Sequence, residues 1–184
     1  MLYRVFPMDP AARRDEAGGP LFVARAMQGG GRHDNPHRYG ALYASREPES
    51  AVAERIQPFL GQVLTEEDLR RADGRRFALA ALDDSNLTGV VDLDDPAELA
   101  RRRIRPSWVA THERAVTQPI ALGLFDEGAT GIGWWSTLEG SWPNVTLFAE
   151  RAAAGLDVSG DPEELSTAHP VLRAAADRLG IRLG

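Results

Sequence analysis

The order of strand-like and helix-like segments constrains the fold of this chain more than any single motif does. They interleave irregularly, without the strict strand–helix alternation that builds a parallel sheet. We therefore predict an α+β fold, with a mixed, mainly antiparallel sheet flanked by helices. The length of 184 residues fits a single domain over residues 1–184. Strands are expected at residues 2–6, 21–27, 41–44, 76–82, 87–93, 131–136 and 144–148, and helices at 51–60, 65–72, 95–103, 107–125 and 170–179.

Proline, glycine and capping residues indicate where several helices begin and end. Asp95 has the character of an N-cap, and Pro96 suits the first position of the helix that follows. Pro119 is expected to kink or split the long helical segment around it. Gly180 is expected to end the last helix.

Composition excludes several classes of function. The chain has no cysteine, so disulfides, thiolate catalysis and cysteine-ligated zinc are ruled out. The net charge of −6 argues against nucleic acid as a direct partner, because phosphate binding needs clustered Lys and Arg. No apolar run approaches the roughly 20 residues needed to span a bilayer, and the N-terminus does not resemble a signal peptide. We expect a cytoplasmic protein without membrane contact.

Familiar ligand-binding patterns are missing or incomplete. The glycines at residues 29–31 lack the spacing of a nucleotide-binding loop. His33 and His37 stand four residues apart, but Pro36 makes that segment a loop, so no metal site is predicted. No serine has the surroundings of a hydrolase nucleophile. Turns and helix caps are the simpler explanation of the acidic run at Asp92, Asp94 and Asp95.

One arrangement of residues is not explained by turns or helix caps. Arg32 follows three glycines, Tyr43 comes eleven residues later, and Glu54 eleven residues after that. Much later, Ser136 follows two tryptophans. The set resembles the RES-domain family, named for an Arg, a Glu and a Ser. The resemblance is continuous over residues 2–54 and returns over 131–148.

The resemblance implies a fold similar to that of ADP-ribosyltransferases and an activity that degrades NAD+. It also implies a toxin of a toxin–antitoxin pair, with a helix-turn-helix antitoxin that blocks the active site. NAD+ would then be a substrate, inorganic phosphate a candidate co-substrate, and no prosthetic group would be needed. An NAD+ phosphorylase and an NAD+ glycohydrolase both fit. The chain departs from the family at His33, where many members carry a large aromatic residue, and at the bulky Trp134–Trp135 pair.

The chemistry suggests different roles for the three residues predicted to be catalytic. Cleavage of the nicotinamide–ribose bond develops positive charge on the ribose, while nicotinamide leaves as a neutral molecule. A general acid is therefore unnecessary, and one carboxylate, Glu54, can stabilise the developing charge. Arg32 is expected to grip the diphosphate or an incoming phosphate. Ser136 is expected to hydrogen-bond the ligand or hold Glu54 in place, since no base beside it would make it a nucleophile.

Further residues are predicted to bind the dinucleotide or to support the site. The resemblance places Arg4 near the ligand, although the polar face of a strand explains it equally well. Tyr43 would pack against or hydrogen-bond the nicotinamide ribose, and Trp135 would stack on a ring; core packing is the alternative for both. His33 and Asn35 are expected to support the ligand-binding residues from behind.

Three questions stay open in the sequence. The acceptor can be phosphate, water or a protein side chain, and the last would make the chain an ADP-ribosyltransferase. A non-catalytic module that binds NAD or an antitoxin is a second alternative. Nothing in the sequence decides between a monomer and a homo-oligomer.

Overall fold

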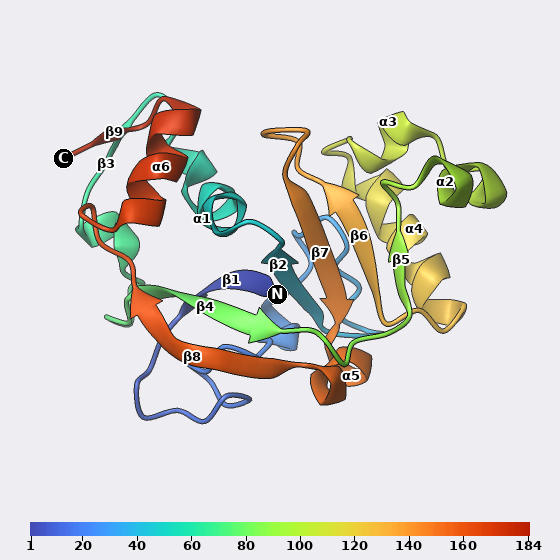
Figure 1. Cartoon of the computed structure of the whole chain (residues 1–184), viewed down its shortest axis with the longest axis horizontal. Coiled ribbons are helices and arrows are strands. Elements are labelled where there is room, and N and C mark those ends of the chain that lie inside the picture. Colours follow the sequence, from blue (N-terminus) through green and yellow to red (C-terminus); the bar gives the residue numbers. More distant parts are fainter. The chain divides into compact units, whose positions relative to one another are not determined.

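The computed structural model describes all residues from Met1 to Gly184. Its fold is α+β, with strands hydrogen-bonded in the order β5-β6-β7-β2-β1-β4-β8. Figure 1 labels the helices and strands. The β5–β6 pair is parallel, whereas the β6–β7, β1–β2, β1–β4 and β4–β8 pairs are antiparallel. The predicted fold class, with its mixed and mainly antiparallel sheet, is therefore confirmed. The chain forms two compact units: unit 1 contains residues 1–22, 45–83 and 157–184, and unit 2 contains residues 23–44 and 84–156.

Unit 1 places two helices against its strands. Helix α1 contacts β1, β4 and α6, and its buried Val52 and Ile56 belong to the same unit as Leu2 and Phe6 of β1. The two buried residues of β1, Leu2 and Phe6, stand an even number of positions apart, so both lie on one face of the strand. The elements of this unit are β1 (Leu2–Pro7), α1 (Pro48–Ile56), β3 (Val63–Leu64), β4 (Phe77–Asp83), β8 (Asp157–Glu164), α6 (Pro170–Leu179) and β9 (Arg182–Leu183).

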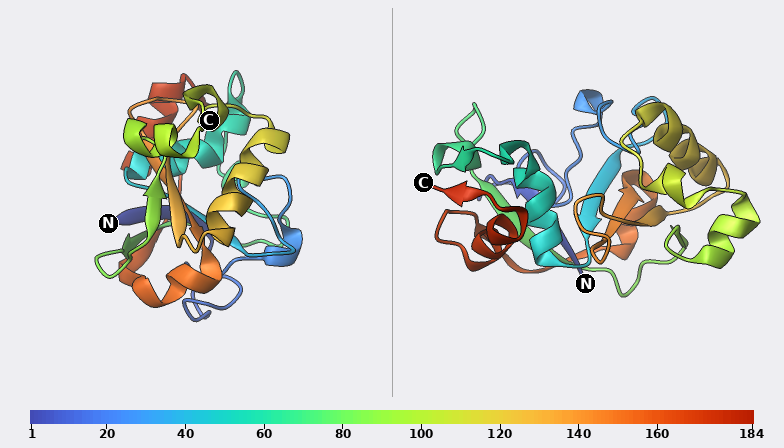
Figure 2. Two further views of the ribbon diagram at one scale, coloured as in Figure 1. Left: turned by 90° about the vertical axis from the view of Figure 1, so that its right-hand side faces the viewer. Right: turned by 90° about the horizontal axis from the view of Figure 1, so that it is seen from above.

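Unit 2 is built around an aromatic core. The ring centroid of Tyr39 lies 4.7 Å from that of Phe125 and 4.4 Å from that of Phe148. Helix α4 packs beside β6 (Figure 2). None of the helices in either unit combines the length and apolarity needed to cross a bilayer. The elements are β2 (Ala41–Ser45, whose last residue falls in unit 1), β5 (Val90–Asp92), α2 (Pro96–Arg102), α3 (Pro106–Val109), α4 (Arg114–Asp126), β6 (Gly131–Trp135), β7 (Pro143–Phe148) and α5 (Ala149–Ala152).

Three predicted segments are wrong in detail. Residues 65–72 form only a 3-10 turn at Glu67–Leu69 and not a helix, because Arg70 pairs with Arg76 in a β-bridge. Residues 21–27 form no strand; they end in a 3-10 turn at Arg25–Met27, because the Phe22 carbonyl accepts a hydrogen bond from Arg4 instead of a strand partner. The segment 107–125 is divided ahead of Pro119, between Val109 and Arg114, and Pro119 lies inside α4. The helix is interrupted where the carbonyl of Thr111 accepts a hydrogen bond from the side chain of Arg32 instead of from a helical amide.

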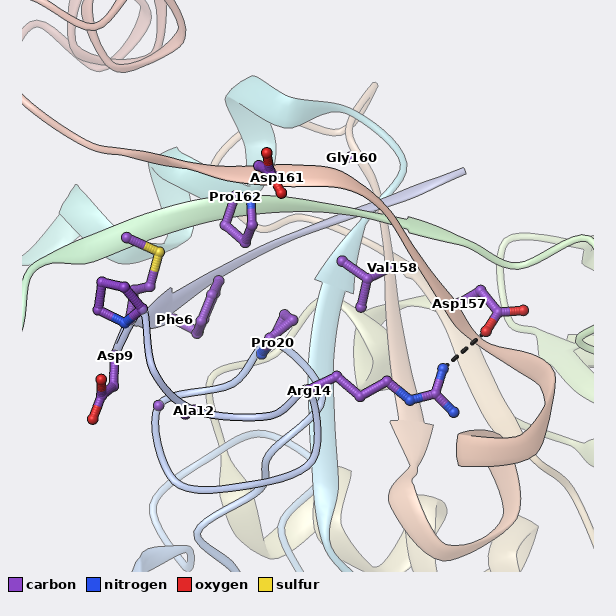
Figure 3. A pocket seen from close by; sticks show the side chains of 13 residues that line it. Phe6, Asp9, Ala12, Arg14, Pro20, Asp157, Val158, Gly160, Asp161 and Pro162 are labelled. Carbon is purple, nitrogen blue, oxygen red and sulfur yellow. Dashed lines mark hydrogen bonds and ion pairs between the residues drawn. The ribbon is translucent and has the colours of Figure 1, made fainter.

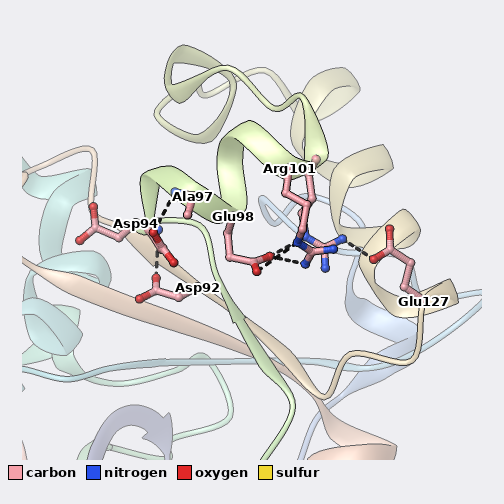
Figure 4. Close-up of polar contacts among 8 residues, drawn as sticks. Asp92, Asp94, Ala97, Glu98, Arg101 and Glu127 are labelled. Atoms are coloured by element: carbon pink, nitrogen blue, oxygen red, sulfur yellow. Dashed lines mark hydrogen bonds and ion pairs between the residues drawn. The ribbon is translucent and has the colours of Figure 1, made fainter.

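Helix α2 begins as its sequence predicts. The Asp95 carboxylate accepts the amide of Ala97, and Pro96 occupies the first position. Figure 4 shows this cap beside an ion-pair group in which Glu98 binds both Arg101 and Arg102. Arg102 also pairs with Glu127, and the Asp92 carboxylate accepts the amide of Asp94. These acidic residues are thus engaged in a cap, a turn and ion pairs.

Arg103, which ends α2, has a left-handed backbone with φ 56° and ψ 34°. Gly180 has almost the same conformation at the end of α6, φ 66° and ψ 27°. Because a Cβ is disfavoured there, Arg103→Gly is expected to raise the free energy of unfolding by about 0.5–1 kcal/mol. Urea denaturation would measure this. Arg101→Gly, inside the same helix, should instead lower it by about 1 kcal/mol; a destabilised Arg103→Gly protein would contradict the strain argument.

Candidate functional site

Arg32 is a fixed, buried cation rather than a solvated loop residue. Its side chain is 7% exposed, and Nη1 donates to the carbonyl oxygens of Val109 at 2.8 Å and Thr111 at 2.5 Å. The guanidinium carbon lies 4.7 Å from the centroid of the Trp134 ring, within cation–π range. The hydroxyl of Thr117 donates to the Arg32 carbonyl at 2.5 Å. The side chain is therefore held by the end of α3 and the α3–α4 connection, and the main chain by α4 itself.

His33 is buried beside Arg32 and remains neutral at physiological pH. Burial, with Coulombic contributions from Arg32 and Arg114, lowers the pKa of His33 to about 3. Its Nδ1 lies 2.8 Å from Oγ1 of Thr146, and its ring meets Trp134 edge-on with centroids 5.6 Å apart. Trp134 Nε1 donates to the same Thr146 hydroxyl at 3.0 Å. The hydroxyl thus joins the histidine to β6 and β7.

The Tyr43 hydroxyl forms two hydrogen bonds inside the protein. It donates to Oδ1 of Asp34 at 2.7 Å and accepts the amide of His33 at 2.9 Å. Burial, followed by the charge of Asp34, raises the pKa of Tyr43 above its usual range, so the phenol stays protonated. The ring of Tyr43 is half-buried, and its hydroxyl already has a donor and an acceptor.

Asn35 supports the main chain at His33. Its Nδ2 donates to the Tyr39 hydroxyl at 2.8 Å and to the Gln118 carbonyl at 3.0 Å. The Tyr39 hydroxyl in turn donates to the His33 carbonyl at 2.8 Å. Burial raises the pKa of Tyr39 to about 12, so this relay keeps its proton. Asn35 therefore acts on the His33 backbone through Tyr39.

Trp135 and Ser136 lie where β6 ends. Trp135 is half-buried, pairs in register with Pro143 of β7 and packs against the core of unit 2. Ser136 is 2% exposed; its amide donates to the Trp142 carbonyl at 2.9 Å, and its Oγ accepts the amide of Leu138 at 3.1 Å. The turn after β6 therefore fixes the position of the Ser136 hydroxyl.

Arg4 and Glu54 belong to unit 1. Arg4 of β1 donates to the carbonyls of Pro20 and, at 2.8 Å, of Phe22. Burial lowers the pKa of Arg4 to about 10, so it is still charged at neutral pH. Glu54 is half-buried on α1, and Gln57 Nε2 donates to its carboxylate oxygen Oε2 at 3.0 Å. The predicted roles of both residues in ligand binding stay predictions.

Comparison with known sequences decides the family. A sequence-family model of the RES domain matches residues 1–168. The chain belongs to the RES-domain family. Among solved structures, a chain of the M. tuberculosis MbcT–MbcA toxin–antitoxin complex matches with a TM-score of 0.63 at 17% identity, covering 98% of this RES protein and 87% of that chain. At this identity the match shows a shared fold. No curated protein sequence matches.

Six of the predicted residues of this RES protein lie in unit 2. Hydrogen bonds connect His33, Tyr43 and Asn35, and Trp134 brings β6 against Arg32, two residues before Ser136. The predictions missed five residues that hold this cluster together. Two lie close to Arg32 in the sequence, Asp34 and Tyr39, and three contact the cluster from far away in the sequence, Thr117, Gln118 and Thr146.

The RES protein has no group of three or more His, Cys, Asp or Glu side chains arranged to hold a metal ion. A cavity of about 350 Å³ lies in unit 1 between the loop after β1 and β8 (Figure 3). Its lining includes Phe6, Pro20 and Val158, with the 2.8 Å ion pair between Arg14 and Asp157 at its edge. The residues that line this cavity include none of those predicted for ligand binding.

Proposed function

We propose that this protein is the toxin of a toxin–antitoxin pair and cleaves NAD+ between nicotinamide and ribose. The observation that carries the proposal is the burial of Arg32 against Trp134, which brings the glycine–arginine segment and the strand before Ser136 together across about a hundred residues of sequence. These are the two stretches in which the chain carries the family pattern. Membership of the RES family and the fold shared with a chain of a toxin–antitoxin complex add support.

The reaction needs one bond broken and one formed. The C–N bond between ribose and nicotinamide breaks, and its electron pair neutralises the pyridinium, so the leaving group needs no proton. Phosphate or water then bonds to the ribose carbon, giving ADP-ribose phosphate or, with loss of a proton, ADP-ribose. Charge develops on the sugar, and a carboxylate stabilises it best. From the sequence pattern we assign that carboxylate to Glu54.

The residues of unit 2 would bind and orient the substrate. Arg32 is a rigid, permanently charged donor suited to a diphosphate. Its position on the Trp134 ring and on two carbonyls lowers the entropy that binding would otherwise cost. Tyr43 would offer its ring face, since its hydroxyl is engaged by Asp34. Ser136, with its hydroxyl fixed by the turn after β6, would position the ligand.

Nicotinamide release by the purified protein tests the proposal and identifies the acceptor. We expect release from NAD+ without any added protein. If phosphate is the acceptor, release should require phosphate and yield ADP-ribose phosphate. If water is the acceptor, the rate should not change with phosphate, and ADP-ribose should accumulate. No release in either buffer, from folded protein, would refute NAD+ cleavage. Label from NAD+ on a discrete protein in a lysate would identify ADP-ribosyl transfer instead.

The toxin role has its own test. Expression of the protein alone is expected to lower cellular NAD+ and stop growth. Co-expression with the product of a neighbouring gene, which we propose to be a small helix-turn-helix antitoxin, should restore both. Unchanged NAD+ and normal growth during strong expression of folded protein would contradict the toxin assignment.

A further inference from the structure

The carboxylate of Asp34 organises the glycine segment that precedes Arg32. Its Oδ2 accepts the amides of Gly29 at 2.8 Å and Gly31 at 2.7 Å, and its Oδ1 accepts the Tyr43 hydroxyl at 2.7 Å. The residue is 5% exposed, so its carboxylate is largely shielded from water. Since two glycine amides point at Asp34, this segment does not present them to a ligand phosphate.

Gly31 is required by this arrangement. A Cβ at residue 31 would lie 2.5 Å from Oδ1 of Asp34 and 2.5 Å from the Tyr43 hydroxyl oxygen. Any side chain there would push apart the pair that is hydrogen-bonded directly above the glycine. The glycine before Arg32 therefore reflects the close approach of Asp34 and Tyr43, and not a flexible loop.

Helix α4 holds the other side of the same segment. Gln118 Nε2 donates to the carbonyls of Gly29 and Gly31, both at 3.0 Å, and Arg114 Nε donates to that of Gly30 at 2.8 Å. All three glycine carbonyls thus have side-chain donors from α4. The peptide segment is clamped between a carboxylate on its amide side and an amide side chain on its carbonyl side.

We propose that Asp34 and Gln118 are positioning residues for Arg32, acting through the main chain of Gly29–Gly31. The segment they clamp ends at the residue before Arg32, and the hydroxyl of Thr117, next to Gln118, holds the Arg32 carbonyl. The guanidinium is then fixed by its own two bonds to the α3–α4 connection. This inference rests on the proposed function, in which Arg32 binds the diphosphate of NAD+.

Gln118→Glu is the sharpest test of the clamp. The side chain keeps its size and is half-buried on α4, but its donor is replaced by an oxygen that faces two carbonyls. Loss of both bonds should make the amides of Gly29–Gly31 exchange hydrogen roughly tenfold faster. The KM for NAD+ should rise roughly tenfold, with kcat within about threefold of the unaltered protein. A loss of folded protein alone would lower the apparent kcat and leave KM unchanged.

Gln62→Glu is the matched control, because Gln62 is exposed and also donates to a backbone carbonyl, that of Pro58 at 3.1 Å. Gln62→Glu should change neither the hydrogen exchange at Gly29–Gly31 nor the KM for NAD+. Unchanged exchange at Gly29–Gly31 in Gln118→Glu would overturn the clamp, whether or not the protein cleaves NAD+. Faster exchange with an unchanged KM in an active protein would overturn the positioning of Arg32. If the unaltered protein releases no nicotinamide, the proposed function fails, and exchange still decides on the clamp.

Discussion

Glu54→Gln is expected to lower the rate of nicotinamide release from NAD+ by roughly 100- to 1,000-fold, the usual effect of removing a group that stabilises transition-state charge. The substituted amide has nearly the shape of the carboxylate but no charge to oppose the positive ribose. Because the interaction strengthens only as the bond breaks, the loss should appear in kcat, with little change in KM. Steady-state assays over a range of NAD+ concentrations would measure both.

The surroundings of Glu54 make this substitution interpretable. The carboxylate oxygen Oε2 accepts a hydrogen bond from Gln57, and the neutral amide can still offer an oxygen to that donor. The side chain is half-buried on α1, so the core of unit 1 is not disturbed. Glu49→Gln, the same change on the same helix, is the control and should retain full activity. If Glu54→Gln kept more than about a third of the activity of a working enzyme, the carboxylate would have no role in stabilising charge.

Secondary structure was predictable wherever a local rule determines it. The cap at Asp95, the stop at Gly180 and the strands around Leu2 and Ala41 depend on residues within a few positions of each other. Strand β8 was missed because its sequence, with Gly160, Pro162 and several acidic residues, has no alternating apolar pattern. It is a strand because β4 pairs with it, and that pairing joins residues about eighty positions apart.

At the candidate site, too, contacts between residues far apart in the sequence could not be predicted. The motif around Arg32 was visible because its residues follow one another closely in the sequence. Gln118 was invisible, since its bonds to Gly29 and Gly31 cross 89 and 87 residues. Asp34 was visible but unassigned: nothing in the sequence says that its carboxylate turns back to the two glycine amides. Predicting those contacts would need the position of α4, which is set by the aromatic core and not by the motif.

Stability at acid pH is expected to depend strongly on His33. The folded protein holds the pKa of this residue at about 3, against an ordinary value of 6.5, through burial and the neighbouring Arg32 and Arg114. Below pH 6.5, His33 is therefore protonated in the unfolded chain but stays neutral in the folded chain. Each further pH unit lowers the free energy of unfolding by about 1.4 kcal/mol. Between pH 6.5 and pH 4 this residue should therefore lower it by about 3 kcal/mol in total.

His33→Asn isolates this contribution, because the amide can pair with Thr146 and does not titrate. The variant should be less stable at pH 7, having lost its packing on Trp134, yet its stability should fall less steeply with pH. Urea denaturation at pH 7, 6, 5 and 4 would show the two curves converging, while His37→Asn, at an exposed position, should run parallel to the unaltered protein. Parallel curves for His33→Asn would mean that the buried ring accepts its proton without cost, which is incompatible with an imidazole that is fully buried and repelled by the charges of Arg32 and Arg114.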